Sequence, residues 1–373
     1  MASSSHVPNV SITVLLQALA TPGAGFGTVT LLVDDQQGTG NPLDPATNGG
    51  AYLDFADADE AQAARDANYI SAEVLEACDV AFSQVPAPSK FRVARVDTGS
   101  TDANIGDTYQ AVRGELSEMG LTDLYCFCLD SRDGAEIEAF VADLDAASGN
   151  YICIGQSSDT DWLAGGYPAA FADLEEGANA CILFHDDDAE WLDVGHACQW
   201  LAWDPDETSA PGENRVRGVA AYTSTLTSTQ RQAAIDNGVG VLGTWGSTDY
   251  WLDNAVTMDG RPIYEHLTAA WFEARTSEDI QTMHQREHAA GRKVLVAPVG
   301  QGQVASVVKK RVAQGEENGH FSPGQTRVTK LPITDADRTA RRIRVQVEAQ
   351  VGIAARQFTV NAYLSQTPVI ETA

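Results

Sequence analysis

One short stretch of the sequence has the residue types and spacing of a metal-dependent hydrolase. His284, Glu287 and His288 spell the H-x-x-E-H pattern of inverted zinc metallopeptidases. On a helix both imidazoles would bind zinc from one face, Glu287 would act as general base, and a carboxylate from elsewhere would complete the site. No downstream carboxylate has a recognisable helical ligand context, and the helix is polar on all sides before it ends at Gly291. We therefore keep a soluble α/β zinc hydrolase only as the alternative function.

Two glycine-rich stretches and two acidic loops also have the residue types of binding sites. Residues 238–243 spell G-x-G-x-x-G, but they lie inside an expected strand, and no helix follows directly. A dinucleotide site needs a strand, a glycine-rich turn and then the start of a helix. Residues 300–302 stand between an expected strand and a helix, yet lack the Lys-Ser/Thr of a phosphate loop. The acidic loops at 54–59 and 185–188 do not have EF-hand spacing. We therefore predict no catalytic residue, no cofactor and no metal site.

The composition is that of a large, acidic globular chain. It has 373 residues, 43% of them hydrophobic, and a formal net charge of −28, which argues against nucleic acid as a partner. No apolar run approaches 18 residues, so we predict no membrane span. The first basic residue is Arg65, so the apolar stretch 12–20 lacks the charged leader of a secretion signal. The six cysteines form no C-x-x-C pair, and we expect them reduced and buried in a cytosolic setting.

The charge is unevenly distributed along the chain. Residues 260–373 contain 15 Lys and Arg against 11 Asp and Glu, whereas residues 1–259 contain 9 against 41. This division predicts two regions in different surroundings, one acidic and solvated, the other packed against partners. Basic residues concentrate at 309–311 and 341–344.

From residue 26 onward, apolar strands alternate with helical patterns, which predicts an α/β domain with a largely parallel sheet. The strands are expected at 26–33, 91–96, 124–129, 151–155, 180–184 and 239–244. The helices are expected at 71–82, 105–119, 135–146, 167–174, 190–201 and 227–237.

A smaller α+β domain is expected beyond a boundary at 251–259. Residues 263–274 keep helical spacing, and Thr276 with Asp279 forms a capping-box signature for a second helix that stops at Gly291. Further on, the pattern predicts a strand, an amphipathic helix and a long alternating strand, at 293–298, 304–313 and 343–351.

Both ends of the chain have the alternation of extended strands. The apolar positions are Val10, Ile12 and Val14 near the start, and Phe358, Val360, Ala362 and Leu364 near the end. A terminal strand must pair with a sheet, either in its own chain or in a neighbour, and the pattern leaves both possibilities open. The expected organisation is an arm at 1–25, an acidic α/β domain at 26–255, a smaller α+β domain at 256–352 and a second arm at 353–373.

Several segments resemble, in order, the contractile tail sheath proteins of bacteriophages, in the branch long catalogued as a phage family of unknown function. They include Asp161-Trp162-Leu163, the segment 219–227 and Trp251-Leu252-Asp253. The same order continues through 263–272, 293–302 and 304–312, and the opening at 7–27 is similar as well.

The resemblance implies a structural subunit, not an enzyme, that forms a homo-oligomeric helical tube of stacked rings around a tail tube. By this resemblance, residues 26–255 would be an outer domain that faces solvent, and residues 256–352 an inner domain that faces the tube. The terminal strands would be donated to neighbouring inner-domain sheets, and Lys309, Lys310 and Arg311 would be candidate tube contacts. Tail tube, baseplate and tail terminator proteins would be the partners, in a virion tail assembled in the host cytoplasm that contracts during infection. Nucleic acid and membrane are not expected as partners. Another self-assembling tail or shell component is a third reading.

Overall fold

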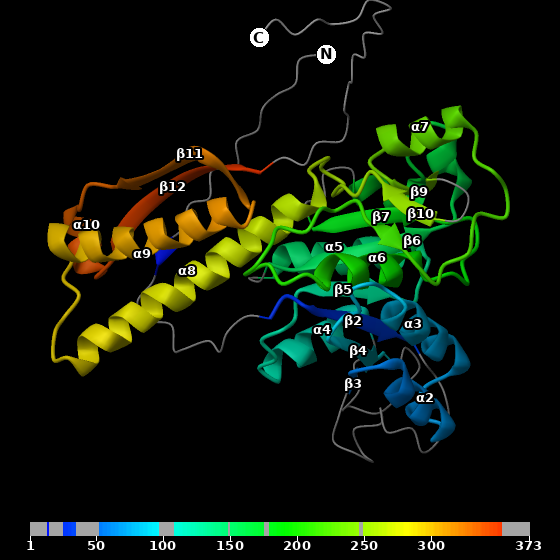
Figure 1. Ribbon diagram of the computed structural model, residues 1–373, viewed down its shortest axis with the longest axis horizontal. Helices are drawn as coiled ribbons and strands as arrows, with labels where there is room; N and C mark the ends of the chain where they lie inside the picture. The colour runs from blue at the N-terminus through cyan, green and yellow to red at the C-terminus, as the bar shows by residue number, and fades with distance from the viewer. Residues whose placement is uncertain are drawn as a thin grey trace, which may run out of the picture.

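The computed structural model describes residues 13–14, 25–34, 52–96, 108–147, 150–174, 179–245 and 249–352. Within them, the elements from β2 to β10 form a layered α/β unit, here called the body, and those from α8 to β12 form a smaller unit, here called the lobe. The lobe extends from one side of the body, and the long helix α8 runs outward to its tip (Figure 1).

The body is built on a nine-stranded sheet in the order β3-β4-β2-β5-β6-β7-β9-β10-β8. The strands from β4 to β9 are parallel, whereas β3, β10 and β8 are antiparallel additions at the two edges. Their bounds are β2 Thr28–Val33, β3 Tyr52–Phe55, β4 Lys90–Arg95, β5 Cys126–Leu129, β6 Ile152–Ser157, β7 Ala180–Phe184, β8 Arg215–Val216, β9 Gly240–Trp245 and β10 Asp249–Asp253. The largely parallel sheet predicted from the alternation is thus confirmed.

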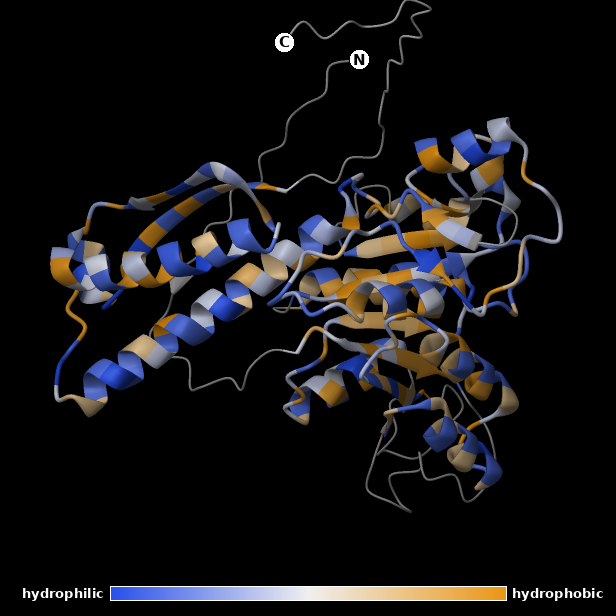
Figure 2. Cartoon of the chain, viewed as in Figure 1, coloured by the Kyte–Doolittle hydropathy of each residue, from blue (hydrophilic) through white to orange (hydrophobic). Residues whose placement is uncertain are grey.

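Helices cover both faces of this sheet, so its central strands are buried throughout. Leu31 and Cys128 join a cluster with α3 and α6, while Leu32 and Leu129 join a second cluster with α4, α5 and α7. The helices are α2 Ala58–Asp66, α3 Ala72–Phe82, α4 Tyr109–Glu118, α5 Gly134–Ala146, α6 Leu192–Leu201 and α7 Ser228–Asp236, with 3₁₀ turns η1 Thr160–Leu163 and η2 Ala169–Leu174. Apolar residues accordingly gather in the strands (Figure 2).

The lobe consists of two long helices under a three-stranded antiparallel sheet in the order β1-β12-β11. Its elements are β1 Thr13–Val14, α8 Ile263–Ala289, α9 Pro298–Glu317, β11 Phe321–Lys330, α10 Asp335–Thr339 and β12 Ile343–Val351. Burial alternates strictly along β12, so the long alternating strand predicted there is confirmed.

Three sequence-based predictions for the lobe are wrong. Thr276 caps no second helix, because α8 continues through it without a break and the side chain is buried. Residues 293–297 form a loop rather than a strand, and Leu295 in it is exposed. Residues 300–302 lie inside α9 and do not connect a strand to a helix.

One prediction for the body is also wrong. The sequence pattern predicts a helix at 167–174, but residues 169–174 form the 3₁₀ turn η2 instead.

The body and the lobe share one continuous hydrophobic cluster. It extends from strand residues such as Val29 and Phe91 to Trp271 of α8, Val308 of α9 and Val347 of β12. All six cysteines are free and buried, as expected. None of the described helices is long and apolar enough to cross a membrane.

Candidate assembly interface

The central strand of the lobe, β12, pairs with a strand on each edge, and the two described pairings differ in length. On one side it pairs with β11 from Thr326 to Lys330, after an irregularity that follows Phe321. On the other side, the described part of β1 pairs with it at Ile343 and Arg344. Among the described residues, no strand pairs with that edge beyond Arg344. Unpaired backbone groups at such an edge are a template for a strand from another chain.

The inner face of this sheet is fixed by aromatic packing on α8 and α9. Phe321 of β11 meets Phe272 of α8 edge-on, with the ring centroids 5.3 Å apart. Gly315 of α9 allows this approach, because an added Cβ would stand 2.5 Å from Cδ2 of Phe321. A small apolar hollow of about 30 Å³ remains between Phe272 and the β12 residues Val347 and Ala349. The sheet is therefore packed closely on α8 and α9 on this face.

The loop after α6 connects the body to the lobe through Asp206. Its carboxylate accepts a hydrogen bond of 2.9 Å from the indole N–H of Trp271 and two from Nε of Arg275, and lies 3.6 Å from Arg311. Burial opposes ionisation, but the hydrogen bonds from Arg275 and Trp271 outweigh it, so the pKa of Asp206 lies below its ordinary value. Its backbone carbonyl also accepts hydrogen bonds from the amides of Gln314 and Asn318.

A buried histidine completes the same junction. His320 stacks on Trp271 with ring centroids 4.2 Å apart, and its Nε2 lies 2.7 Å from the carbonyl oxygen of Pro205 in the body. Its Nδ1 lies 3.0 Å from the hydroxyl of Thr268. Burial lowers the pKa of His320, so the ring is neutral at neutral pH. Body and lobe are thereby joined by directional contacts as well as by the shared core.

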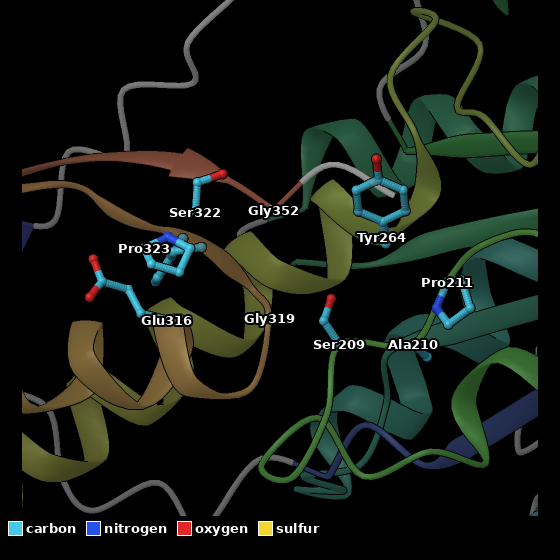
Figure 3. Close-up of a pocket in the computed structure, with 10 residues that line it drawn as sticks. Ser209, Ala210, Pro211, Tyr264, Glu316, Gly319, Ser322, Pro323 and Gly352 are labelled. Carbon is cyan, nitrogen blue, oxygen red and sulfur yellow. The ribbon is translucent and has the colours of Figure 1, made fainter. Parts of the chain in front are cut away.

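A cavity of about 400 Å³ lies beside this junction (Figure 3). The body segment around Ser209 forms one wall, and Ser322 and Pro323 of β11 form the opposite one (Figure 3). Gly352, the last residue described, also lines it. The chain therefore continues into its C-terminal segment from the boundary between body and lobe.

The predicted tube contacts lie in the middle of α9 and differ in availability. Lys309 and Lys310 are exposed. Arg311 donates a 2.7 Å hydrogen bond to Asp279, and its guanidinium lies over the ring of Trp271 at 5.6 Å. Arg311 thus acts inside the subunit, and the two lysines are the accessible cations of the group.

The H-x-x-E-H residues lie at the C-terminal end of α8 without the geometry of a hydrolase. The rings of His284 and His288 are 5.3 Å apart, but the carboxylate of Glu287 is held by Arg292 at 2.6 Å. Hydrogen bonding from Arg292 lowers the pKa of Glu287, which weakens it as a general base. The described residues include no group of three or more potential metal ligands.

Most of the predicted strand donors lie outside the described residues. These are Val10, Ile12, Phe358, Val360, Ala362 and Leu364. Val14 belongs to β1, whose backbone pairs with Ile343 of the same chain. Sequence reasoning missed Asp206 and His320, because their hydrogen-bond partners are 52 to 115 residues away along the chain.

The structure combines an α/β body with a smaller lobe whose antiparallel sheet lies on α8 and α9. No protein-family model matches the sequence, and no curated protein matches it. Solved structures do match. A chain of the anti-feeding prophage (AFP) baseplate is 14% identical, with a TM-score of 0.65, over 97% of this chain and 100% of that one.

Two further structures match along most of their length. The first is the sheath complex of an extracellular contractile injection system, PVC, in its contracted state, with 11% identity and a TM-score of 0.56 over 98% of each chain. The second is a sheath tail protein from Listeria innocua, with 10% identity and a TM-score of 0.52 over 83% of this chain and 89% of that one. The chain has the fold of contractile tail sheath proteins, which confirms the resemblance at the level of fold.

Proposed function

We propose that this chain is a structural subunit of a phage contractile tail sheath and not an enzyme. The observation that carries the proposal is the likeness of nearly the whole chain, 97–98% of its length, to chains of the AFP baseplate and the PVC sheath. These proteins share little sequence with it, so the common feature is the arrangement of body and lobe. No observation favours the zinc hydrolase.

Assembly would proceed by strand exchange at the β12 edge that β1 contacts. Residues 7–14 would exchange the pairs that Thr13 and Val14 make within their own chain for the same pairs in a neighbour, and residues 357–364 would be added to the lobe of a neighbour as a further strand. Subunits linked in this way would build stacked rings into a helical tube. The arms at 1–25 and 353–373 would then be the links between an outer body and an inner lobe.

Contraction would be mechanical. The junction at Asp206 and the shared core would keep body and lobe together, so each subunit would move as nearly one rigid unit while the strand links persist. New interface burial between subunits would supply the energy as the lattice becomes shorter and wider during genome ejection into the host. The tube inside would be contacted by Lys309 and Lys310, and baseplate and terminator proteins would close the two ends of a virion tail assembled in the host cytoplasm.

Electron microscopy of the purified full-length protein tests this proposal. Negative staining at high concentration should show hollow tubules or stacked rings, and deletion of residues 357–373 should leave a soluble, folded monomer that forms none. A finer variant is Val360→Asp, which places a charge on the apolar face of the donor strand, with Asn361→Asp on the polar face as its matched control. Normal tubules from the deletion would disprove the arm assignment.

A further inference from the structure

The tip of the lobe carries a hollow of about 640 Å³ between the end of α8, the following loop and the turn after α10. Its polar wall comprises His284, His288, Lys293, Arg341 and Arg342. Its lining contains no carboxylate among the described residues. The hollow therefore suits an anionic group.

Nearby acidic residues neutralise only part of this wall. Asp337 is occupied by Arg342 and Arg344, at 2.8 and 2.9 Å, and Glu287 is occupied by Arg292. Neither Lys293 nor Arg341 has an ion-pair partner within the part of the chain that the structure describes. Two exposed cations thus remain available on one hollow.

Apolar side chains beside these cations indicate a polypeptide ligand. Val294, Leu295 and Val296 line the hollow, and Leu295 is 52% exposed. Val299, one turn further on, is 65% exposed. A free anion would leave these side chains in water, whereas a peptide with apolar and acidic residues would cover both kinds of group.

We propose that this hollow binds Val369–Glu371 from the C-terminal segment of a second copy of this chain. That segment places two β-branched apolar residues directly before a carboxylate, matching the valine-rich loop and the free cations. The inference rests on the proposed strand exchange. If residues 357–364 lie along the neighbour's β12, Val369 is five residues further and can reach about 17 Å. If that strand runs antiparallel to β12, Leu364 lies near Ile343, the end of β12 that adjoins Arg341 and Arg342, so the hollow is within this reach.

A peptide-binding experiment tests the assignment. A fluorescein-labelled peptide of residues 365–373 is titrated with the full-length protein at low ionic strength, and anisotropy is measured. The double substitution Lys293→Glu with Arg341→Glu should weaken binding by about tenfold or more. Arg338→Glu, on neighbouring α10 and outside the lining, should leave it unchanged. A peptide with Glu371→Lys should lose binding to the wild type and regain it with the double variant.

Each outcome decides the assignment. Equal binding by the double variant, or no binding at all, would overturn it. Full-length protein that carries Glu371→Lys has an emptied hollow whichever copy supplies the ligand. If this variant binds the peptide better than the wild type by a factor that dilution of the protein does not change, the hollow is filled from the same chain, which contradicts a second copy as donor. Tubules without peptide binding would refute only the assignment of Val369–Glu371 to the hollow. Peptide binding by a protein that never assembles would instead refute the sheath function.

Discussion

Replacement of Asp206 by alanine should loosen the connection between body and lobe. The indole N–H of Trp271 would lose its acceptor in a buried position, which costs about 1–3 kcal/mol. Loss of the ion pairs with Arg275 and Arg311 adds only about 1 kcal/mol. The Asp206 side chain is 32% exposed, so solvent screens these pairs, and Arg275 and Arg311 keep the carboxylates of Glu278 and Asp279 as partners. We therefore expect Asp206→Ala to lower the free energy of unfolding by about 2–4 kcal/mol.

Urea denaturation followed by tryptophan fluorescence and far-UV circular dichroism measures this loss. Glu207→Ala is the matched control, because this neighbouring side chain is exposed and should change the free energy of unfolding by less than about 0.5 kcal/mol. Equal stabilities for the two alanine variants would refute the role of Asp206 in joining body and lobe.

The same carboxylate predicts a pH dependence. The folded-state pKa of Asp206 lies below its unfolded value, so its stabilisation is complete at neutral pH and is lost as the pH falls below about 4. Asp206→Asn should therefore lose stability less steeply than the wild type in that acidic range. An identical acid slope in both proteins would contradict the ion pairs described here.

Three further predictions follow from buried positions. Gly315→Val should destabilise the lobe by about 1–3 kcal/mol in urea denaturation, because its Cβ would overlap Phe321, whereas Gly302→Ala should be neutral or stabilising. Burial lowers the pKa of His196 to about 3, so between pH 6.5 and 4 only the unfolded state binds a proton at this residue. The free energy of unfolding of the wild type should therefore fall by about 1.4 kcal/mol per pH unit over this range. His196→Phe should not show this fall when urea midpoints are compared. A thiol reagent should label none of the six cysteines in the folded protein and all six in urea, and rapid labelling without urea would contradict their burial.

The sequence pattern predicted the body well where strands are buried on both faces. Central strands such as β5 and β7 are continuous apolar runs next to amphipathic helices. They can therefore be recognised as strands from their own residues and those next to them in the sequence. The edge strands β3, β8 and β10 were missed because they are two to five residues long and partly polar. Their pairing depends on partners that a single sequence does not reveal.

In the lobe, two local signals were misleading for physical reasons. Thr276 has the residue type of a helix cap, but it lies on the buried face of a continuous helix, where tertiary packing decides. The apolar run at 294–296 has strand composition, yet it forms the loop beside the basic hollow. An apolar run that stays exposed is typical of an interaction surface rather than of a core strand.

A helical reconstruction of the assembled protein by electron cryomicroscopy would test the central claim most directly. We expect residues 357–364 of one copy to lie as an added strand beside β12 of another, with body and lobe in the relative position seen in Figure 1. An assembly in which every β12 edge is covered only by strands of its own chain would contradict it.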